Sequence, residues 1–134
     1  MRRKILVVDD NAELLDLICF NLKQAGFATG TARDGVEALK KARSLAPDLI
    51  LLDLMLPELD GFAVCEILRH DPATASIPVM MITALNSELS RFAGLEAGAN
   101  EYVTKPFSPR ALVSRVEHLI HKNETGTAKC TDCQ

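Results

Sequence analysis

The sequence predicts a single α/β domain built on a parallel sheet. Short apolar strand patterns and amphipathic helix patterns alternate five times along the 134 residues, an order typical of a parallel sheet with helices on both faces. A chain of this length can bury one proper hydrophobic core. Its most apolar stretch, residues 49–52, is an unbroken run of Leu and Ile, as expected for a strand buried on both faces.

The first two strand and helix units are marked by their turn residues. Residues 4–8 form the first expected strand, after which Asn11 is suited to cap a helix that Gly26 ends. Residues 27–31 form a weaker second strand. Its helix opens at the pair Asp34 and Gly35 and is over by Pro47.

The remaining three units follow the same order. The strand over 49–52 leads through Pro57, Asp60 and Gly61 into a helix over residues 62–69. A fourth strand over 78–82 precedes a helix over 87–97, and a fifth over 101–103 precedes a helix capped by Ser108 with Pro109 in its first turn. The side chains expected to face the core are Leu14, Leu15, Ile18, Leu22, Val36, Leu39, Ala42, Phe62, Cys65, Ile67, Leu68, Leu112, Val113, Val116, Leu119 and Ile120.

Composition excludes several classes of protein. The net charge of −3 argues against a general nucleic-acid binder, which would carry a basic patch. The chain has no apolar run of membrane-spanning length, and the apolar run after its basic start is too short for a signal peptide. Cys19 and Cys65 fall on apolar helical faces, unlike a secreted disulfide framework. We therefore expect a soluble, cytoplasmic protein.

Polar residues follow four of the expected strands at the point where each strand ends. Asp9 and Asp10 follow the first strand, Asp53 the third, Thr83 the fourth and Lys105 the fifth. A parallel sheet gathers these carboxyl ends on one edge, where ligands bind in open α/β sheets. Three crowded acids repel one another unless a cation joins them, and Mg²⁺ prefers such oxygen ligands.

These residues are the parts needed to phosphorylate an aspartate. A carboxylate beside Mg²⁺ can act as a nucleophile and form an aspartyl phosphate. Phosphoryl transfer mainly requires in-line positioning and neutralisation of the phosphoryl oxygens. Lys105 supplies a cation and Thr83 a hydroxyl on neighbouring strands, so Asp53 is the predicted acceptor.

Five short motifs resemble the receiver domain of two-component response regulators. They are Val7-Val-Asp-Asp10, Leu51-Leu-Asp-Leu-Met-Leu-Pro57, Asp60-Gly61, Ile82-Thr-Ala84 and Tyr102-Val-Thr-Lys-Pro-Phe107. The resemblance runs in order from about residue 3 to residue 121. It implies a doubly wound, flavodoxin-like fold with strand order 2-1-3-4-5.

The resemblance also implies a role for each site residue. Asp53 is the implied phosphoacceptor, and Asp10, Asp53 and the backbone carbonyl of Met55 are the implied ligands of Mg²⁺, for which Mn²⁺ can substitute. Asp9 is implied to act through the waters of the metal. Thr83 and Lys105 are implied to hold the phosphoryl oxygens, and Tyr102 is the implied switch aromatic. Met55, Ala84 and Leu85 flank the phosphate in this reading.

The implied partner is a sensor histidine kinase or a phosphotransfer protein, whose phosphohistidine donates to Asp53. The added charge is expected to bias a surface formed by the fourth helix, the fifth strand and the fifth helix. Beyond self-phosphorylation and slow self-dephosphorylation, no enzymatic activity is expected, because the apolar Met55 and Leu85 cannot orient a hydrolytic water. The downstream partner is open, and the chain itself is expected to bind neither nucleic acid nor membrane.

The chain is expected to be a monomer or a phosphorylation-linked dimer. Many winged-helix regulators carry an acid early in the last helix for a dimer salt-bridge network, and here Ala111 occupies that place. Asn100 stands where Asp is common, although Glu101 and Arg115 can still pair.

Three other functions are alternatives to a phosphorylated receiver domain. An aspartyl-phosphate hydrolase needs a second acid two residues after the nucleophile, where this chain has Met55. A nucleotide-binding flavodoxin-like protein needs a phosphate-cradling loop after the first strand, where Asp9 and Asp10 would repel the phosphate. A receiver-fold interaction module that works without phosphorylation is the remaining alternative.

The receiver domain is expected to span residues 1–122, followed by a flexible tail over residues 123–134. Cys130 and Cys133 in this tail, with His118 and His121 of the last helix, form a possible tetrahedral zinc set. The competing interpretation is a pair of solvated histidines and a loose pair of thiols.

Overall fold

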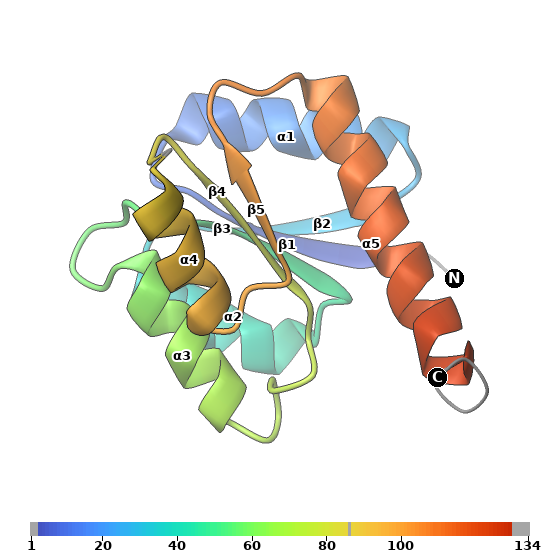
Figure 1. Ribbon diagram of the computed structural model, residues 1–134. Coiled ribbons are helices and arrows are strands. Elements are labelled where there is room, and N and C mark those ends of the chain that lie inside the picture. Colours follow the sequence, from blue (N-terminus) through green and yellow to red (C-terminus); the bar gives the residue numbers. More distant parts are fainter. Residues whose placement is uncertain (1–2, 86, 130–134) are drawn as a thin grey trace.

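The computed structural model describes residues 3–85 and 87–129, with side chains described up to Lys122. Five strands and five helices alternate in this part of the chain (Figure 1). The strands are β1 (Lys4–Val8), β2 (Ala28–Ala32), β3 (Leu49–Asp53), β4 (Val79–Thr83) and β5 (Glu101–Thr104). The helices are α1 (Ala12–Gln24), α2 (Gly35–Leu45), α3 (Gly61–His70), α4 (Glu88–Glu96) and α5 (Pro109–Lys129).

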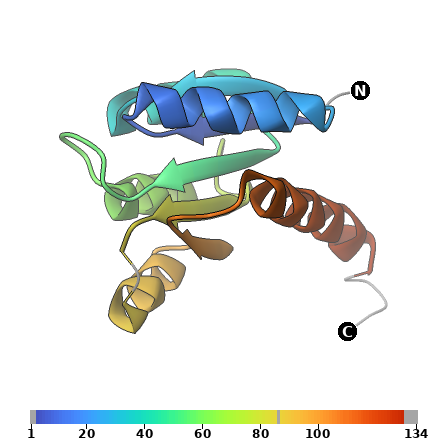
Figure 2. The same ribbon diagram turned by 90° about the horizontal axis from the view of Figure 1, so that it is seen from above.

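All five strands are parallel, in the order β2-β1-β3-β4-β5. This confirms the predicted flavodoxin-like topology. Helices α1 and α5 cover one face of the sheet and α2, α3 and α4 the other, as Figures 1 and 2 show from two directions. Strand β3 lies in the centre with all five of its residues buried. The central position of β3 therefore explains its unbroken apolar run.

Alternate residues of the strands feed two separate cores. Leu6 and Val8 of β1 pack toward α2 and α3, whereas Ile5 and Val7 pack toward α1 and α5. This alternation follows from the period of two along a strand. Cys19 and Cys65 are both buried free thiols, as predicted.

Side-chain caps hold the helices in place on the sheet, and Asn11 and Ser108 are the two that the sequence predicted. Side chains of Asn11, Asp34, Asp60 and Ser87 each accept a backbone N–H of the first turn of α1, α2, α3 and α4, respectively. Ser108 does the same for α5, where its Oγ accepts the N–H of Ala111 at 3.3 Å. Each helix start is thus fixed by its own sequence next to the strand that precedes it.

Two core assignments were wrong. Val36 and Ile67 were expected to face the core but are 46% and 44% exposed, respectively. The buried side of α2 consists of Gly35, Ala38 and Ala42, and that of α3 of Gly61, Val64, Cys65 and Leu68. Each buried stripe repeats at spacings of three and four residues, and Val36 and Ile67 lie beside these stripes rather than in them.

Helix α5 continues to Lys129, beyond the domain end expected at residue 122. The division into a domain over 1–122 and a flexible tail over 123–134 stays a prediction. Among the helices that the structure describes, none combines the length and hydropathy needed to cross a membrane.

Candidate functional site

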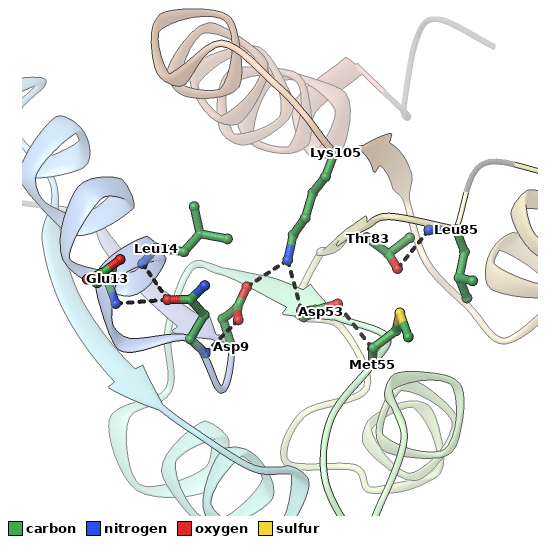
Figure 3. Close-up of polar contacts among 9 residues, drawn as sticks. Asp9, Glu13, Leu14, Asp53, Met55, Thr83, Leu85 and Lys105 are labelled. Carbon is green, nitrogen blue, oxygen red and sulfur yellow. Dashed lines mark hydrogen bonds and ion pairs between the residues drawn. The ribbon is translucent and has the colours of Figure 1, made fainter.

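Two buried carboxylates and one ammonium group meet at the carboxyl edge of the sheet. Lys105 Nζ lies 3.1 Å from Asp9 Oδ2 and 3.0 Å from Asp53 Oδ2, between the ends of β1 and β3 (Figure 3). Asp9 is 2% exposed and Asp53 is 4% exposed. The structure therefore brings together three of the five residues predicted for this edge, by direct contact across three strands.

Backbone groups fix the second oxygen of each buried carboxylate. The N–H of Asn11 donates to Asp9 Oδ1 at 2.9 Å, and the N–H of Met55 donates to Asp53 Oδ1 at 3.0 Å. The turn after β3 is stabilised by Gly61, whose N–H donates to the Leu54 carbonyl at 2.9 Å. A Cβ at Gly61 would lie 2.6 Å from the Leu54 Cα. Only glycine allows α3 to begin so close to the Asp53 turn.

Asp10 completes an acidic cluster that fits a divalent cation. Ligand oxygens of Asp9, Asp10 and Asp53 lie within 4.8 Å of one another, and Asp10 is exposed to solvent. Three carboxylates beside one Lys105 ammonium leave two formal negative charges. Each carboxylate oxygen of Asp9 and Asp53 keeps a second lone pair beside the hydrogen bond that it accepts. The donor set therefore matches a hard cation that prefers oxygen ligands.

Burial and charge act in opposite directions on the pKa values of this cluster. Burial raises the pKa of Asp53, and the charge of Asp9 adds to this effect, while the Met55 N–H and Lys105 work against it. Burial alone would lower the pKa of Lys105, but the two carboxylates outweigh it and raise that pKa. The ammonium form of Lys105 is thus strongly favoured beside its carboxylate partners.

Thr83 ends β4 beside this cluster and is fully buried. Its Oγ1 accepts the N–H of Leu85 at 3.2 Å, which fixes the turn after the strand (Figure 3). Leu85 is partly buried, whereas Met55 is 57% exposed beside Asp53. Ala84 is also exposed. The residues predicted to flank a phosphate thus offer no charged side chain to it.

Tyr102, the predicted switch residue, is buried under α4 in the middle of β5. It is 3% exposed, and its hydroxyl donates to the Leu85 carbonyl at 2.8 Å. Tyr102 is therefore connected to Thr83 through the backbone of one residue, Leu85. The peptide bond between Lys105 and Pro106 is cis.

Two residues at this edge were not predicted from the sequence as parts of the site. Asn11 was identified only as a helix cap, although its N–H also orients Asp9. The Arg33 guanidinium donates to the Asp10 carbonyl at 3.3 Å. Arg33 follows β2, which pairs with β1, so the strand order rather than any local motif could have indicated it.

Two predictions concern residues away from this edge. Glu101 and Arg115 pair within the chain, with 2.9 Å between Oε2 and Nη1. Cys130 and Cys133 lie outside the described residues, so the zinc hypothesis with His118 and His121 stays a prediction.

Solved structures share this fold over nearly the whole chain. A putative response regulator from Chloroflexus aurantiacus is 36% identical, with a TM-score of 0.85 over 90% of this chain and 99% of that one. A BeF3-activated DrrB receiver domain is 35% identical, with a TM-score of 0.80 over 90% of this chain and 99% of that one. These levels of identity show relationship as well as fold.

Curated relatives are larger proteins. The alkaline phosphatase synthesis transcriptional regulatory protein PhoP of Bacillus subtilis is 48% identical over 124 residues, covering 92% of this chain and 51% of PhoP. The DNA-binding dual master transcriptional regulator RpaA of Synechocystis is 44% identical over 121 residues, covering 90% of this chain and 50% of RpaA. The chain thus spans about half the length of these relatives.

The family model for the response regulator receiver domain matches residues 5–117. The matched range contains the whole acidic cluster, Lys105 and all five strands except Lys4, the first residue of β1. The chain therefore belongs to the response regulator receiver domain family.

Proposed function

We propose that this chain is a phosphorylation-controlled signalling domain in which Asp53 accepts a phosphoryl group from the phosphohistidine of a histidine kinase or a phosphotransfer protein. One observation carries the proposal: the Lys105 ammonium lies between the buried Asp9 and Asp53 carboxylates at 3.1 and 3.0 Å. This arrangement keeps an acceptor carboxylate and a cation together, at the edge of the sheet where ligands bind.

Asp10, Asp53 and the Met55 carbonyl would hold Mg²⁺ or Mn²⁺, with Asp9 acting through the waters of the metal. The bound ion would neutralise charge on the phosphoryl oxygens during transfer. Two formal negative charges left over after pairing with Lys105 support this assignment. The crowding of the carboxylates also supports it, because three such groups are otherwise held together against their mutual repulsion.

The transfer itself is a displacement at phosphorus. A carboxylate oxygen of Asp53 forms the new O–P bond as the P–N bond of the phosphohistidine breaks and its electron pair returns to the imidazole nitrogen. Lys105 contacts the phosphoryl oxygens from the side of β5, and the Thr83 hydroxyl contacts them from β4. The Thr83 oxygen accepts the Leu85 N–H, so the hydroxyl hydrogen can donate to a phosphoryl oxygen without breaking that contact.

The output of the domain is proposed to be a contact with a partner protein through α4, β5 and α5. Support comes from α4, which exposes two large apolar side chains, Leu89 at 78% and Phe92 at 62%. The relatives PhoP and RpaA are named as transcriptional regulators, but about half of each relative's length lies outside the match. We assign no direct DNA contact to the chain.

The phosphorylated form is proposed to be long-lived. Met55 and Leu85 follow Asp53 and Thr83 by two residues each, and neither side chain carries a strong hydrogen-bonding group that could orient an attacking water. Self-dephosphorylation is therefore expected to be slow, and the chain acts as a phosphoacceptor in signalling rather than as a turnover enzyme.

The test is intact-mass measurement after incubation with acetyl phosphate and Mg²⁺. Wild type should gain the mass of one phosphoryl group, and Asp53→Asn should gain none. Asp16→Asn, which changes an exposed acid of α1, is the matched control and should behave as wild type. A folded wild-type protein that binds Mg²⁺ yet gains no mass would favour the interaction module that works without phosphorylation.

A further inference from the structure

The loop between β3 and α3, residues 54–60, carries the Met55 carbonyl, one of the ligands proposed for the metal ion. Its backbone is not held in this shape by local preference alone. Glu58 has a φ of 71°, in the left-handed region that residues other than glycine rarely adopt. Such a conformation persists only where surrounding contacts hold it. The contacts between this loop and the rest of the fold therefore determine where Met55 lies.

Leu59 joins this loop to helix α2. Its side chain packs against the core on the α2 and α3 side of the sheet, and its N–H donates to the Pro57 carbonyl at 2.7 Å. Gly35, the buried first residue of α2, lies directly against it. A Cβ at Gly35 would lie 2.8 Å from the Leu59 carbonyl oxygen and 2.9 Å from the Leu59 Cβ. The backbone of the loop thus packs on the backbone of Gly35.

A side chain at position 35 would have no flexible neighbour to displace. Two of the three closest atoms belong to the rigid part of Leu59, and the third, Val64 Cγ2 at 2.8 Å, belongs to a fully buried residue of α3. All three separations are shorter than van der Waals contact. A methyl group at Gly35 is therefore expected to displace the backbone at Leu59, and the rest of the β3–α3 loop with it.

Gly30 of β2 provides a comparison toward the C-terminal end of α2. A Cβ at Gly30 would also approach to 2.8 Å, but its neighbour is Leu45 Cδ1, the end of a flexible side chain. Leu45 and Leu59 are both partly buried and pack against the same core. Helix α2 thus takes part in two contacts between a glycine and a leucine, and only the one at Gly35 involves the loop that carries Met55.

The start of α2 also contacts the loop that carries Asp10. Arg33 Nη2 donates to the Asp10 carbonyl at 3.3 Å. The Arg33 N–H donates to Glu37 Oε1 at 2.9 Å, and the Glu37 N–H donates to Asp34 Oδ1 at 2.8 Å, so the first turn of α2 fixes this segment. The start of α2 therefore contacts both loops that supply proposed metal ligands.

We propose that Gly35 is a positioning residue for the divalent cation. Because it has no side chain, the start of α2 can lie against Leu59, and this contact keeps the Met55 carbonyl in place beside the ligand carboxylates. The inference rests on the proposed function, because the Met55 carbonyl is assigned as a ligand there. It extends the metal site to a helix that supplies no ligand itself.

The test is a titration of the full chain with Mn²⁺ and no phosphodonor, followed by the electron paramagnetic resonance signal of the free ion. Gly35→Ala should raise the dissociation constant for Mn²⁺ by about tenfold, as for loss of a group that orients a metal ligand. Gly30→Ala adds the same methyl group at the same closest approach and should keep the wild-type constant. Unfolding in urea without metal separates a loss of stability, which both variants can show, from a loss of affinity.

Substitutions of the two leucines keep the test decisive if Gly35→Ala does not fold, as judged by circular dichroism. Leu59→Ala removes the side chain that anchors the loop in the core and should weaken Mn²⁺ binding, although less than Gly35→Ala. Leu45→Ala is the matched control, because it shortens a partly buried leucine of the same core. It should leave the dissociation constant unchanged.

A wild-type dissociation constant in both Gly35→Ala and Leu59→Ala would overturn the inference. Equal weakening by Gly30→Ala and Leu45→Ala would also overturn it, because the effect would then come from general loosening of the fold. In both cases wild type still binds Mn²⁺, so the proposed function is unaffected. Wild type that binds no Mn²⁺ would refute the proposed metal site and the inference together.

Intact-mass measurement on the same samples tests the phosphoacceptor role of Asp53 separately. Weaker Mn²⁺ binding by Gly35→Ala alone of the two glycine variants would support the inference even if wild type gained no phosphoryl mass. The failure of the phosphoacceptor role is thereby distinguished from the failure of the positioning role.

Discussion

Long cationic side chains join loops at both edges of the sheet, but they have different partners. At the carboxyl edge, Lys105 contacts the buried carboxylates of Asp9 and Asp53. At the amino edge, Arg69 of α3 donates only to neutral oxygens among the residues that the structure describes. These are the carbonyls of Ala75, Ile77 and Gly98 and the side-chain amide of Asn100, at 3.2, 2.6, 2.9 and 2.8 Å.

The contacts of Lys105 are expected to change when a phosphoryl group or a metal ion binds, whereas the contacts of Arg69 are expected to stay the same. The contacts of Lys105 to charged groups can be exchanged for a phosphoryl group or altered by a metal ion, because their strength depends on charge nearby. Backbone carbonyls keep the same charge in every state. Arg69 is therefore expected to hold the C-terminal end of α4 and the start of β5 in every state. The turn after β4, at the other end of α4, can move when a phosphoryl group binds.

Replacing Lys105 should have the largest effect on phosphorylation. Lys105→Met keeps the length of the side chain but removes the only ammonium group that contacts Asp9 and Asp53 in the described part of the chain. We expect the rate of phosphorylation by acetyl phosphate to fall by about 100-fold, as for removal of one preorganised donor from a transition state. The rate is measured as mass gain over time. Lys41→Met, which removes an ammonium group paired with Glu37 on α2, is the control and should keep the wild-type rate.

Replacing Arg69 should instead reduce stability and spare the chemistry. Arg69→Met removes all four hydrogen bonds of the guanidinium. The free energy of unfolding in urea should fall by about 2 kcal/mol, because partly buried carbonyls lose their donors.

Arg43→Met provides the control for Arg69→Met. It breaks an exposed pair with Asp71 and should cost less than about 0.5 kcal/mol. A phosphorylation rate in folded Arg69→Met as low as that of Lys105→Met would contradict the division of roles between the two cations.

The sequence predicted the role of Lys105 but not that of Arg69. Lys105 was identified because it follows a strand, and the carboxyl ends of parallel strands converge on one edge whatever the details of packing. Arg69 was not identified, because its partners are carbonyls from two loops and their positions depend on the packing of α3 and α4 against the sheet. The same limit applies to Gly94 of α4, which lies against the Tyr102 ring, because close approach to a side chain of another element leaves no local pattern.

The errors in the predicted core have a related cause. Apolar periodicity correctly placed all five helices, but it cannot tell which apolar residue lies at the margin of a buried stripe. Val36 and Ile67 lie at such margins and are exposed, and whether a marginal residue is covered depends on how the helix packs against the sheet. Helix–sheet distance depends on the whole set of contacts and is not encoded in one segment.

The lifetime of the phosphorylated form tests a third feature of the Lys105 edge, the apolar side chains of Met55 and Leu85. Met55→Asn combined with Leu85→Lys introduces polar groups that can orient a water beside the phosphoryl group. The half-life of phosphorylated protein, followed by intact mass after removal of the donor, should shorten by about tenfold. Met55→Leu with Leu85→Met preserves the apolar character and should keep the wild-type half-life. An unchanged half-life in the polar double variant would refute the role of these two residues.

The smallest expected effect comes from giving Arg69 one charged partner, as Lys105 has. Asn100 Oδ1 accepts the Val79 N–H at 2.9 Å and Arg69 Nη2 at 2.8 Å. Asn100→Asp keeps both acceptor contacts and adds a negative charge, so both become charge-assisted. The free energy of unfolding at neutral pH should rise by about 1 kcal/mol.

This gain should depend on pH in a defined direction. The new carboxyl group is held in its ionised form by Arg69, so its pKa in the folded chain lies below the value of about 3.9 in the unfolded chain. The added stability is then present above that unfolded value and is lost as the pH falls through the folded value. Urea titrations of wild type and Asn100→Asp at several pH values between neutrality and about pH 3 measure the difference. A variant that is less stable than wild type at neutral pH would mean that desolvation of the carboxylate outweighs its attraction to Arg69. The neutral acceptors around Arg69 would then be the more stable arrangement at that edge of the sheet.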